Sequence, residues 1–432
     1  MAATISILVI LLAFLGTPLL AVLGLLGAIN FAWVSQVPLQ AMITKVYGLM
    51  AAPGILALPL FTFMGYILTE TKSPERLARF FNAWLGWVPG GLALTTILAY
   101  TAFSAMTGGS ALAIMALGGI FFASLLESGY DKKFALGICT AAGSEGIMLP
   151  PSIPVIIIAF LAYESIEAVY VGGIGPSILA VGLLTFYASF KGRKTGAALI
   201  PFSSSKALAA LVEVLPEVPL PAIVLVGLFS GWLNIVEIAT LALVYTLIVE
   251  VVLRRELSLE HLKAAARQSM VLVGAIFSIL VSALAFSNFL VDFEVPQKFL
   301  AFLQGLITSK LVFLLFLNVI LLITGCLMDV FSAVLVMVPL LLPVSKGFGI
   351  DPIHFCVIFL WNMEIGFSTP PIGFNLFVAN FRFHEPLEKL WAAVMPILGL
   401  KLLALIIITY WLDLTLWLPR SLGMRQELIE FF

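Results

Sequence analysis

Long apolar segments separated by short polar stretches run along nearly the whole chain. They cover 5–34, 53–71, 91–126, 134–163, 172–190, 219–253, 269–291, 310–345, 353–381 and 390–418. A helix needs about 20 apolar residues to cross a bilayer, so the pattern predicts a bundle of membrane-spanning helices. Several segments are too long for one crossing and carry Gly or Pro near the middle. We expect these to form hairpins or broken helices.

The composition supports a membrane protein. Hydrophobic residues make up 62% of the 432 residues, and charged residues only 10%. A soluble domain carries about 25% charged residues, so this chain has too few to cover a surface in water. A cytosolic enzyme, a nucleic-acid-binding protein and a disordered protein are therefore excluded. The three cysteines lie inside apolar segments and lack the spacing of a disulfide framework or a metal site.

The basic residues predict how the chain is oriented, because cytoplasmic loops carry an excess of Lys and Arg. Fifteen of the 22 fall in five stretches that we assign to the cytoplasm: 72–90, 128–133, 191–217, 254–268 and 382–389. Six fall on the opposite side, namely Lys45, Lys298, Lys310, Lys346, Arg420 and Arg425, and the last, Lys401, lies inside an apolar segment. This assignment of the basic residues to the two sides of the membrane requires that 91–126 and 310–345 each return to the side where they begin. Both are predicted to be re-entrant hairpins that open to opposite faces.

The chain also matches itself at a shift of about 220 residues. Gly129-x-Asp131 matches Gly349-x-Asp351, Gly146 matches Gly366, and Pro150-Pro151 matches Pro370-Pro371, all at a shift of 220. Ser110-Ala111 matches Ser332-Ala333 at a shift of 222. Each half therefore reads as an amphipathic linker, a hairpin with a small-residue tip, a Gly-x-Asp turn and a helix broken at Pro-Pro. The charge sorting makes these two repeats inverted.

The predicted fold is thus an all-α polytopic membrane protein with two inverted repeats. The first repeat spans 1–190, with its hairpin at about 91–126 and its broken helix at about 134–163. A cytoplasmic linker covers 191–218. The second repeat spans 219–418, with its hairpin at about 310–345 and its broken helix at about 353–381, and a C-terminal tail covers 419–432. Inverted repeats with broken helices are typical of secondary transporters, in which free carbonyls bind Na⁺ and half-helix N-termini face anions.

The hairpin tips and the breaks supply the candidate ligands. In the first half, Ser104, Thr107 and Ser110 offer oxygen atoms around a Gly108-Gly109 turn, opposite the stretch 143–152. Small residues at such positions also serve close helix packing, but the matching second half favours a ligand site. There the tip 325–332 faces the stretch 362–375.

Charged residues inside apolar segments are functional candidates, because burying charge in a membrane is costly. Asp329 is the preferred direct cation ligand, whereas Glu364 either binds a cation or holds the broken helix as a structural acceptor. Glu145 contacts a cationic substrate group, coordinates an ion or hydrogen-bonds nearby backbone. Lys401 either pairs with an acid on another helix or subunit, or faces a protein crevice on a tilted helix, which we favour. With no other Lys or Arg deep in the hairpin regions, backbone amides, hydroxyls and bound Na⁺ would hold a carboxylate substrate.

The motifs of common enzymes are missing from the sequence. It has no HExxH, no Walker A and no GxSG, and 347–351 narrowly misses the GxGD pattern of intramembrane aspartyl proteases. We therefore expect no enzymatic activity and no cofactor, and an ion gradient as the energy source.

Seven motifs along the chain resemble the large membrane subunit, of the DctM type, of tripartite ATP-independent periplasmic (TRAP) transporters. In the first half they are Phe103-Ser104-Ala105 through Ser110, Ser128-Gly129-Tyr130 with Phe134-Ala135-x-Gly137, and Gly143 to Pro154. In the second half they are Met328-Asp329 with Ser332-Ala333, Gly349-Ile350-Asp351-Pro352-x-His354-Phe355, Asn362-x-Glu364-Ile365-Gly366 with Thr369-Pro370-Pro371-x-Gly373-x-Asn375, and Leu416-Trp417-Leu418-Pro419.

The resemblance implies a Na⁺-driven importer of the bacterial inner membrane with the elevator architecture of the ion-transporter superfamily. Such a chain works with a small four-helix membrane subunit and a periplasmic protein that captures a small organic acid, both expected here as separate polypeptides. A stand-alone Na⁺/dicarboxylate symporter of the same superfamily is the alternative. An intramembrane enzyme is the alternative from another class, and the motif search disfavours it.

The resemblance also implies at least two Na⁺ sites. The first would use Ser104, Gly108, Ser110, Gly143, Ser144 and Gly146. The second would use Gly325, Asp329, Ser332, Glu364, Gly366 and Thr369. The expected substrate contacts are Thr107, Gly108, Gly109, Glu145, Pro150, Ser152, Ser368, Pro370 and Asn375. Glu145 departs from the family, which more often has an uncharged residue there, and Lys401 is unusual for a scaffold helix.

Overall fold

A computed structural model describes residues 19–33, 53–196, 201–292 and 294–424, together with the single residues 17, 44 and 47. Within these ranges the chain is helical and contains no strand, so the all-α fold predicted from the sequence is confirmed. Part of the apolar segment 5–34, the basic residues Lys45 and Arg425, and residues 425–432 of the expected tail lie outside the described residues.

Seven of the described helices are long and apolar enough to cross a membrane, or up to nine spans if each of two bent pairs counts as one. The seven are α7 (Ser110–Glu127), α10 (Ile166–Thr195), α13 (Ile235–Leu247) with the π-helix η2 (Ile248–Leu253), α14 (Leu259–Asp292), α16 (Lys310–Leu327), α17 (Val330–Gly347) and α20 (Leu387–Tyr410). In one bent pair, α4 (Pro53–Thr69) meets α5 (Ser73–Leu85) at 69°. In the other, α11 (Ser204–Val214) meets α12 (Pro219–Ser230) at 58°.

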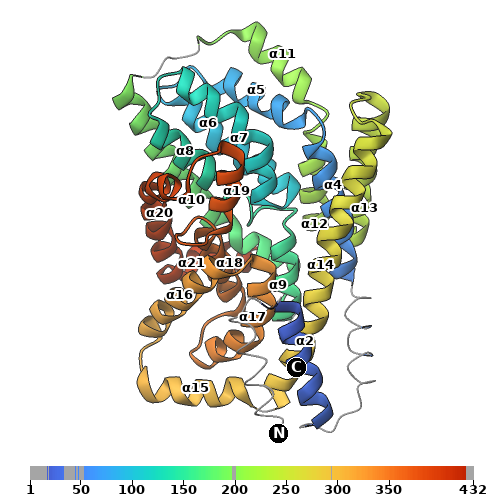
Figure 1. Cartoon of the computed structure of the whole chain (residues 1–432), viewed down its shortest axis with the longest axis vertical. Helices are drawn as coiled ribbons and strands as arrows, with labels where there is room; N and C mark the ends of the chain where they lie inside the picture. Colours follow the sequence, from blue (N-terminus) through green and yellow to red (C-terminus); the bar gives the residue numbers. More distant parts are fainter. Residues whose placement is uncertain are drawn as a thin grey trace.

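Each expected hairpin segment holds two helices joined by a very short turn. In the first, α6 (Gly91–Thr107) and α7 are joined at Gly108-Gly109. Gly108 has φ +69, a left-handed conformation that favours glycine. In the second, α16 and α17 are joined at Met328-Asp329. Figure 1 shows α6 and α7 in the upper half of the molecule and α16 and α17 in the lower half, so the two hairpins point toward each other.

The two segments expected to be broken helices are interrupted in the middle. Helix α8 (Lys132–Ala141) passes into the 3₁₀ turn η1 (Ala142–Ser144), and the chain becomes helical again only at α9 (Ile153–Ala162). Likewise α18 (Pro352–Gly366) ends before α19 (Phe374–Phe383) begins. The cis peptide bonds Pro150-Pro151 and Pro370-Pro371 lie in these interruptions.

The same turn introduces both broken helices. Gly129 and Gly349 have left-handed φ values of +88 and +71. Two residues later, the Asp131 carboxylate accepts a hydrogen bond from the Phe134 amide at 3.3 Å, and Asp351 caps α18 in the same way. A carboxylate at this position satisfies free amide groups and complements the helix dipole, so the Gly-x-Asp turn starts each helix.

Contacts bring the five basic stretches together at one end of the molecule. Arg79 forms an ion pair with Glu213, which joins 72–90 to 191–217. Lys132 forms an ion pair with Glu385, which joins 128–133 to 382–389. Gly192 lies so close to Gly90 that an added Cβ would be 2.2 Å from its Cα, and Tyr130 lies beside it. The stretch 254–268 joins this end through Glu256, described next. The stretches grouped by the charge pattern therefore share one end.

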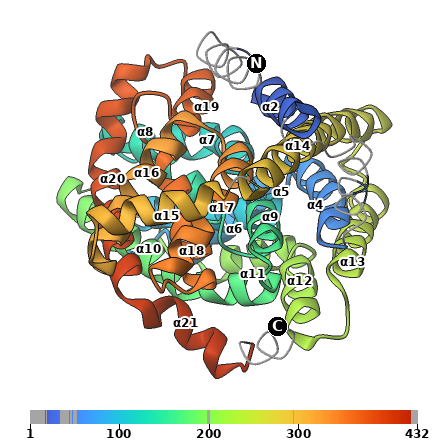
Figure 2. The ribbon, with the colours of Figure 1, turned by 90° about the horizontal axis from the view of Figure 1, so that it is seen from below.

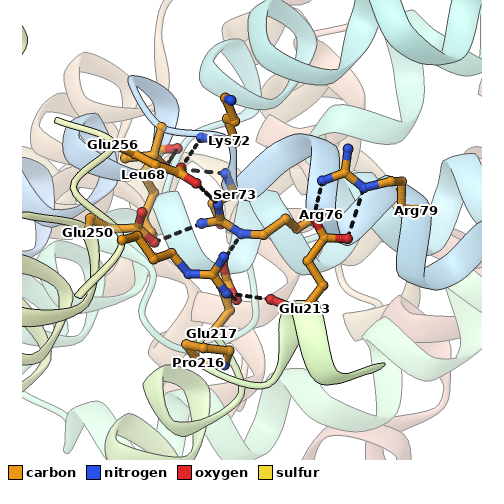
Figure 3. A network of polar contacts seen from close by, with 12 residues as sticks. Leu68, Lys72, Ser73, Arg76, Arg79, Glu213, Pro216, Glu217, Glu250 and Glu256 are labelled. Carbon is orange, nitrogen blue, oxygen red and sulfur yellow. Dashed lines mark hydrogen bonds and ion pairs between the residues drawn. The ribbon is translucent and has the colours of Figure 1, made fainter. Parts of the chain in front are cut away.

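At that end, a buried arginine of α5 binds the turn between α11 and α12 and the segment that contains and follows η2 (Figure 3). The Arg76 side chain, in the first turn of α5, is 1% exposed. Its guanidinium donates hydrogen bonds to Glu217, to Glu250 at 2.9 Å and to Glu256 at 2.7 Å. Glu217 lies between α11 and α12, and the other two lie in or just after η2. A planar guanidinium has enough donors for three acceptors, so Arg76 fixes α5 to both of these segments.

The pKa of Glu256 indicates that this network contains charged groups. Partial burial raises the pKa of its carboxyl, but the hydrogen bonds from Arg76 and from the Lys72 amide outweigh burial, so the pKa lies below its usual range. Glu256 is therefore ionised at neutral pH and pairs with Arg76 as a charged group. The pattern of apolar and polar segments did not predict this network, because its residues lie far apart in the sequence.

The helices form two groups that face each other. Helices α2 (Leu19–Trp33), α4, α12, α13 and α14 pack on one another, and we call them the α4–α14 group. Helices α6 to α10, α16 to α20 and α21 (Leu412–Ser421) pack into what we call the hairpin group. Figure 2 shows the two groups side by side, with α15 (Val295–Leu306) lying across the molecule. The main contacts between the groups are made by α4 with α6 and α9, and by α14 with α17.

Candidate functional site

A cavity of about 280 Å³ lies where the two hairpin turns meet the two interruptions. Thr107, Gly108 and Gly109 of the first turn line it, as do Asp329 of the second turn and Phe367 of the second interruption. On its other side it is lined by residues of α4 and α14. The cavity therefore lies between the two helix groups, with both halves of the hairpin group contributing to one wall.

Four of the described helices begin at this cavity. It is lined by the first residue of each, namely Ser110 of α7, Ile153 of α9, Val330 of α17 and Phe374 of α19. The amide groups of a first helical turn have no partner within the helix, and the helix dipole makes this end positive. Among the described residues, no side chain caps α7, α9 or α19, whereas Asp329 caps α17. The N-termini of α7 and α9 therefore suit an anion, and that of α17 is already neutralised.

The residues expected around the first ion site lie close together. A Cβ added at Gly146 would be 2.5 Å from the Ala105 amide nitrogen and 2.9 Å from the Ser104 Cβ, and one added at Gly143 would be 3.0 Å from the Ser110 carbonyl oxygen. The Ser104 hydroxyl is buried and, among the described residues, has no hydrogen-bond partner. An unpartnered buried oxygen is costly, and a cation at this place would satisfy it.

The second expected site is assembled in a similar way. A Cβ added at Gly366 would be 2.5 Å from the carbonyl carbon of Gly325, so the two backbones touch. The Cys326 thiol approaches the carbonyl oxygens of Thr369 at 3.4 Å and Pro370 at 3.2 Å. The structure therefore brings Gly325, Gly366 and Thr369 together. Gly146 contacts Ala105 just as Gly366 contacts Gly325, and both pairs are related by the shift of 220 residues.

Asp329 has a structural role that the sequence analysis did not foresee. Its carboxylate caps α17, accepting hydrogen bonds from the amides of Phe331 at 2.9 Å and Ser332 at 3.1 Å. The Ser332 hydroxyl also donates to this carboxylate. The side chain is exposed to the cavity, where it is the only carboxylate or basic group among the described lining residues.

Lys401 lies in the core of the hairpin group and is 1% exposed. Its ammonium is 2.8 Å from a Glu145 oxygen and 3.2 Å from a Glu364 oxygen, and it donates to the Ser144 hydroxyl at 2.9 Å. Pairing with an acid on another helix is thus confirmed for Lys401 by Glu364 of α18, with Glu145 of the first interruption as a second partner, and the preference for a crevice-facing lysine was wrong. The error arose because its partners are distant in the sequence.

These contacts also bear on the two glutamates. Glu364 holds Lys401, which favours the structural-acceptor interpretation over direct ion binding. For Glu145, the observed contact is with Lys401 and matches none of the three roles considered from the sequence. We had weighed partners among substrate, ions and backbone, but not a lysine of α20.

Several residues expected to contact a substrate lie away from the cavity lining. They are Glu145, Pro150, Ser152, Ser368, Pro370 and Asn375. Asn375 accepts a hydrogen bond from the Ser110 hydroxyl at 2.8 Å and so joins α19 to α7. The Ser152 backbone binds the Tyr170 hydroxyl, with its amide at 2.7 Å and its carbonyl at 2.8 Å. Ser152 therefore joins the first interruption to a neighbouring helix, as Asn375 does for the helix that follows the second interruption.

The sequence analysis missed most of the apolar cavity wall. Tyr66 of α4, Leu272 of α14, and Phe331 and Phe374 of the hairpin group line the cavity. Each of them lies in an apolar segment that looks like any other membrane span, so no pattern marked them. Aromatic and aliphatic walls with a few polar groups are typical of small-molecule sites.

Opposed hairpins, interrupted helices and a cavity between two helix groups define this chain as a polytopic membrane transport protein. The family model described as "Tripartite ATP-independent periplasmic transporter, DctM component" matches residues 6–414. The chain belongs to this family, and it is a large permease subunit of the bacterial inner membrane. The family is one of transporters and not of enzymes.

Known relatives match this chain over most of its length. The C4-dicarboxylate TRAP transporter large permease protein DctM of Pseudomonas aeruginosa is 33% identical over 93% of this chain and 94% of its own length. The isethionate TRAP transporter permease protein DctMQ of Oleidesulfovibrio alaskensis is 33% identical over 91% of this chain but only 62% of its own length. The solved structure of the YdaH transporter of Alcanivorax borkumensis covers 94% of this chain with a TM-score of 0.63 at 16% identity, which shows a shared fold.

Proposed function

We propose that this chain is the Na⁺-coupled importing subunit of a TRAP system and moves a small organic acid delivered by a periplasmic binding protein. The observation that carries the proposal is the cavity between the two hairpin turns, at which the uncapped N-termini of α7 and α9 meet. The named substrates of the relatives in Pseudomonas and Oleidesulfovibrio, C4-dicarboxylates and isethionate, are small organic anions.

Backbone amides bind the anion in this proposal. No Lys or Arg is among the described residues that line the cavity, so the amides of the first turns of α7 and α9 and the Thr107 hydroxyl provide the donors. Anions bind at helix N-termini because unpaired amides and the helix dipole act together. Such a site holds its ligand weakly, which suits a carrier that must release it.

Two Na⁺ ions bind beside the anion. The first site uses Ser104, Ser110 and the carbonyls of 143–146, and is supported by the unpartnered Ser104 hydroxyl. The second uses Asp329 and the backbone around Gly325, Gly366 and Thr369, and is supported by the exposure of the Asp329 carboxylate to the cavity. Hydroxyl, carbonyl and carboxylate oxygens are the ligands of hard cations.

The hairpin group moves as an elevator against the α4–α14 group, and the chain is an inverted repeat of 1–190 and 219–418. Matching turns, interruptions and glycine contacts at one sequence shift support the repeat. The elevator is supported by the cavity, because α4 and α14 form one wall and the hairpin group forms the other. Substrate can then be carried when one wall slides past the other.

A small four-helix membrane subunit and a periplasmic binding protein complete the system. The Oleidesulfovibrio relative is named DctMQ and is longer than this chain, which supports a physical association of the large subunit with a Q subunit. The periplasmic partner is supported by the family description itself.

The proposed function is tested by uptake into proteoliposomes that contain this chain and its small subunit. We expect uptake of a radiolabelled C4-dicarboxylate only when an inward Na⁺ gradient and the loaded periplasmic protein are both present. Replacing Na⁺ with K⁺ is the control for the gradient. Uptake without the periplasmic protein would instead identify a stand-alone symporter, and uptake without Na⁺ would contradict the coupling.

Cross-linking tests the elevator. Leu272 of α14 and Phe331 of α17 line the same cavity from the two helix groups. In the test variant, both are replaced with cysteine. We expect a short bifunctional thiol reagent to stop Na⁺-driven uptake in this variant, because the link prevents the groups from sliding. The control pair, Leu56→Cys of α4 with Leu241→Cys of α13, lies within the α4–α14 group and away from the cavity lining, and should keep its uptake after cross-linking. Equal uptake by both linked proteins would contradict an elevator.

A further inference from the structure

The Lys401 side chain extends from the middle of α20 to the place where α8 and α18 end. Four oxygen atoms surround its ammonium nitrogen within 3.2 Å. They belong to the Ala141 carbonyl at 2.8 Å, the Ser144 hydroxyl at 2.9 Å, the Glu145 carboxylate at 2.8 Å and the Glu364 carboxylate at 3.2 Å. We call these four oxygens and their residues the Lys401 nest.

The nest is electronegative for reasons beyond its two carboxylates. Ala141 is the last residue of α8, and Glu364 lies in the last turn of α18. Carbonyls at a helix C-terminus lack partners within the helix, and the dipole makes that end negative. A carboxylate in the last turn is unfavourable there unless a cation lies next to it. Two helix ends and two carboxylates thus converge on one point.

This negative charge cannot be screened by water. The side chains of Glu145, Glu364 and Lys401 are all 0% exposed. In addition, Glu145 Oε2 and Glu364 Oε2 have no hydrogen-bond partner among the described residues. Buried carboxylates without a counter-charge are strongly unfavourable, so the cation at the centre of the nest is required for the fold.

We propose that the Lys401 nest is a monovalent-cation site that the chain fills with its own side chain. Carbonyl, hydroxyl and carboxylate oxygens at two half-helix C-termini are the ligand set that binds alkali ions in broken-helix transporters. Here the cation is covalently attached, so it stays in place while cargo ions come and go. It also joins an interruption from each half to α20, and so makes Lys401 a positioning residue for both interruptions.

The inference rests on contacts within the chain and is independent of Na⁺ coupling. It separates Lys401 from the proposed cargo-ion sites, because its charge is never exchanged. It also explains why Ser144 and Glu364 make poor ligands for a transported ion, since Lys401 already occupies Ser144 Oγ and Glu364 Oε1.

Removing the built-in cation should make the protein depend on an added one. The variant Lys401→Ala leaves the other nest residues in place and opens room for a small cation. Its unfolding midpoint, measured on purified protein in detergent with a bulky organic cation as the only salt cation, should fall by on the order of 5 °C. Methylammonium at equal ionic strength should restore at least half of this loss, because it replaces the missing ammonium group.

The wild-type protein is the control and should not respond to methylammonium, since its nest is filled. Methylammonium is the informative probe because its effect does not depend on transported Na⁺, so a failure of Na⁺ coupling would leave the result unchanged. If Lys401→Ala is as stable as wild type in the bulky cation, or gains nothing from methylammonium or Na⁺, the proposal is wrong.

A second variant keeps the test decisive if Lys401→Ala fails to accumulate in the membrane. Lys401→Met with Glu145→Gln and Glu364→Gln removes the cation together with both carboxylates, so no buried charge is left without a counter-charge. We expect this triple variant to accumulate better than Lys401→Met alone and to be insensitive to methylammonium. Equal accumulation of the single and triple variants would contradict the proposal, because the buried carboxylates would then not need a cation.

Discussion

Asp329→Asn should weaken the Na⁺ dependence of uptake at least tenfold and leave the protein folded. Asparagine caps a helix about as well as aspartate, so the start of α17 should keep its hydrogen bonds to the amides of Phe331 and Ser332. What the variant loses is the negative charge that faces the cavity. A hydrogen bond or contact to a charged group is worth about 1.5–3 kcal/mol, so we expect Na⁺ affinity to fall at least tenfold, by roughly 1.4 kcal/mol or more. The measurement is the Na⁺ dependence of uptake in proteoliposomes.

A matched control separates capping from ion binding. Asp351 caps α18 through the Ile353 amide at 2.9 Å and is not among the residues that line the cavity. Asp351→Asn should therefore leave the Na⁺ dependence of uptake unchanged. Asp329→Ala removes both cap and charge, and should in addition lower the unfolding midpoint. Normal Na⁺ dependence in Asp329→Asn would show that this carboxylate serves only as a helix cap.

The architecture was readable from the sequence because its signals are local. Gly108-Gly109 marks one hairpin turn, and Pro150-Pro151 and Pro370-Pro371 mark the interruptions, since glycine favours turns and two adjacent prolines remove two backbone donors. The distribution of Lys and Arg then required each hairpin to return to its own side. These signals depend on short stretches of chain and not on which helix packs against which.

The partners of the buried charges were not readable, because they depend on tertiary packing. Lys401 was recognised as unusual, but its glutamates lie in other segments, and no periodicity connects them to α20. The same holds for Arg76, which looks like an ordinary residue of an amphipathic helix, although it is buried among three glutamates. For Asp329 the sequence suggested only a cation ligand, and its role as the cap of α17 became visible only in the structure.

The second large effect is expected from the glycines that join hairpin to interruption. In Gly366→Ala the new Cβ would lie 2.5 Å from the carbonyl carbon and 2.6 Å from the Cα of Gly325. Both are backbone atoms that cannot rotate away, so α16 and α18 must separate, and overpacking of this kind costs about 1–3 kcal/mol or more. Because the proposed second ion site lies at this contact, we expect Gly366→Ala to lose Na⁺-driven uptake.

Gly146→Ala should have the same effect in the first half, because its Cβ would lie 2.5 Å from both the Ala105 amide nitrogen and the Thr101 carbonyl oxygen. Gly399→Ala in α20 is the control, since its Cβ would meet no atom within 4 Å and alanine favours a helix over glycine. Uptake rates normalised to the amount of folded protein in the vesicles provide the comparison. If all three variants transport equally, the glycine contacts do not position the ion sites, and the equivalence of the two halves has no functional consequence there. If only the first two lose uptake, the backbone contact shared by both halves is what holds each hairpin turn against its interruption.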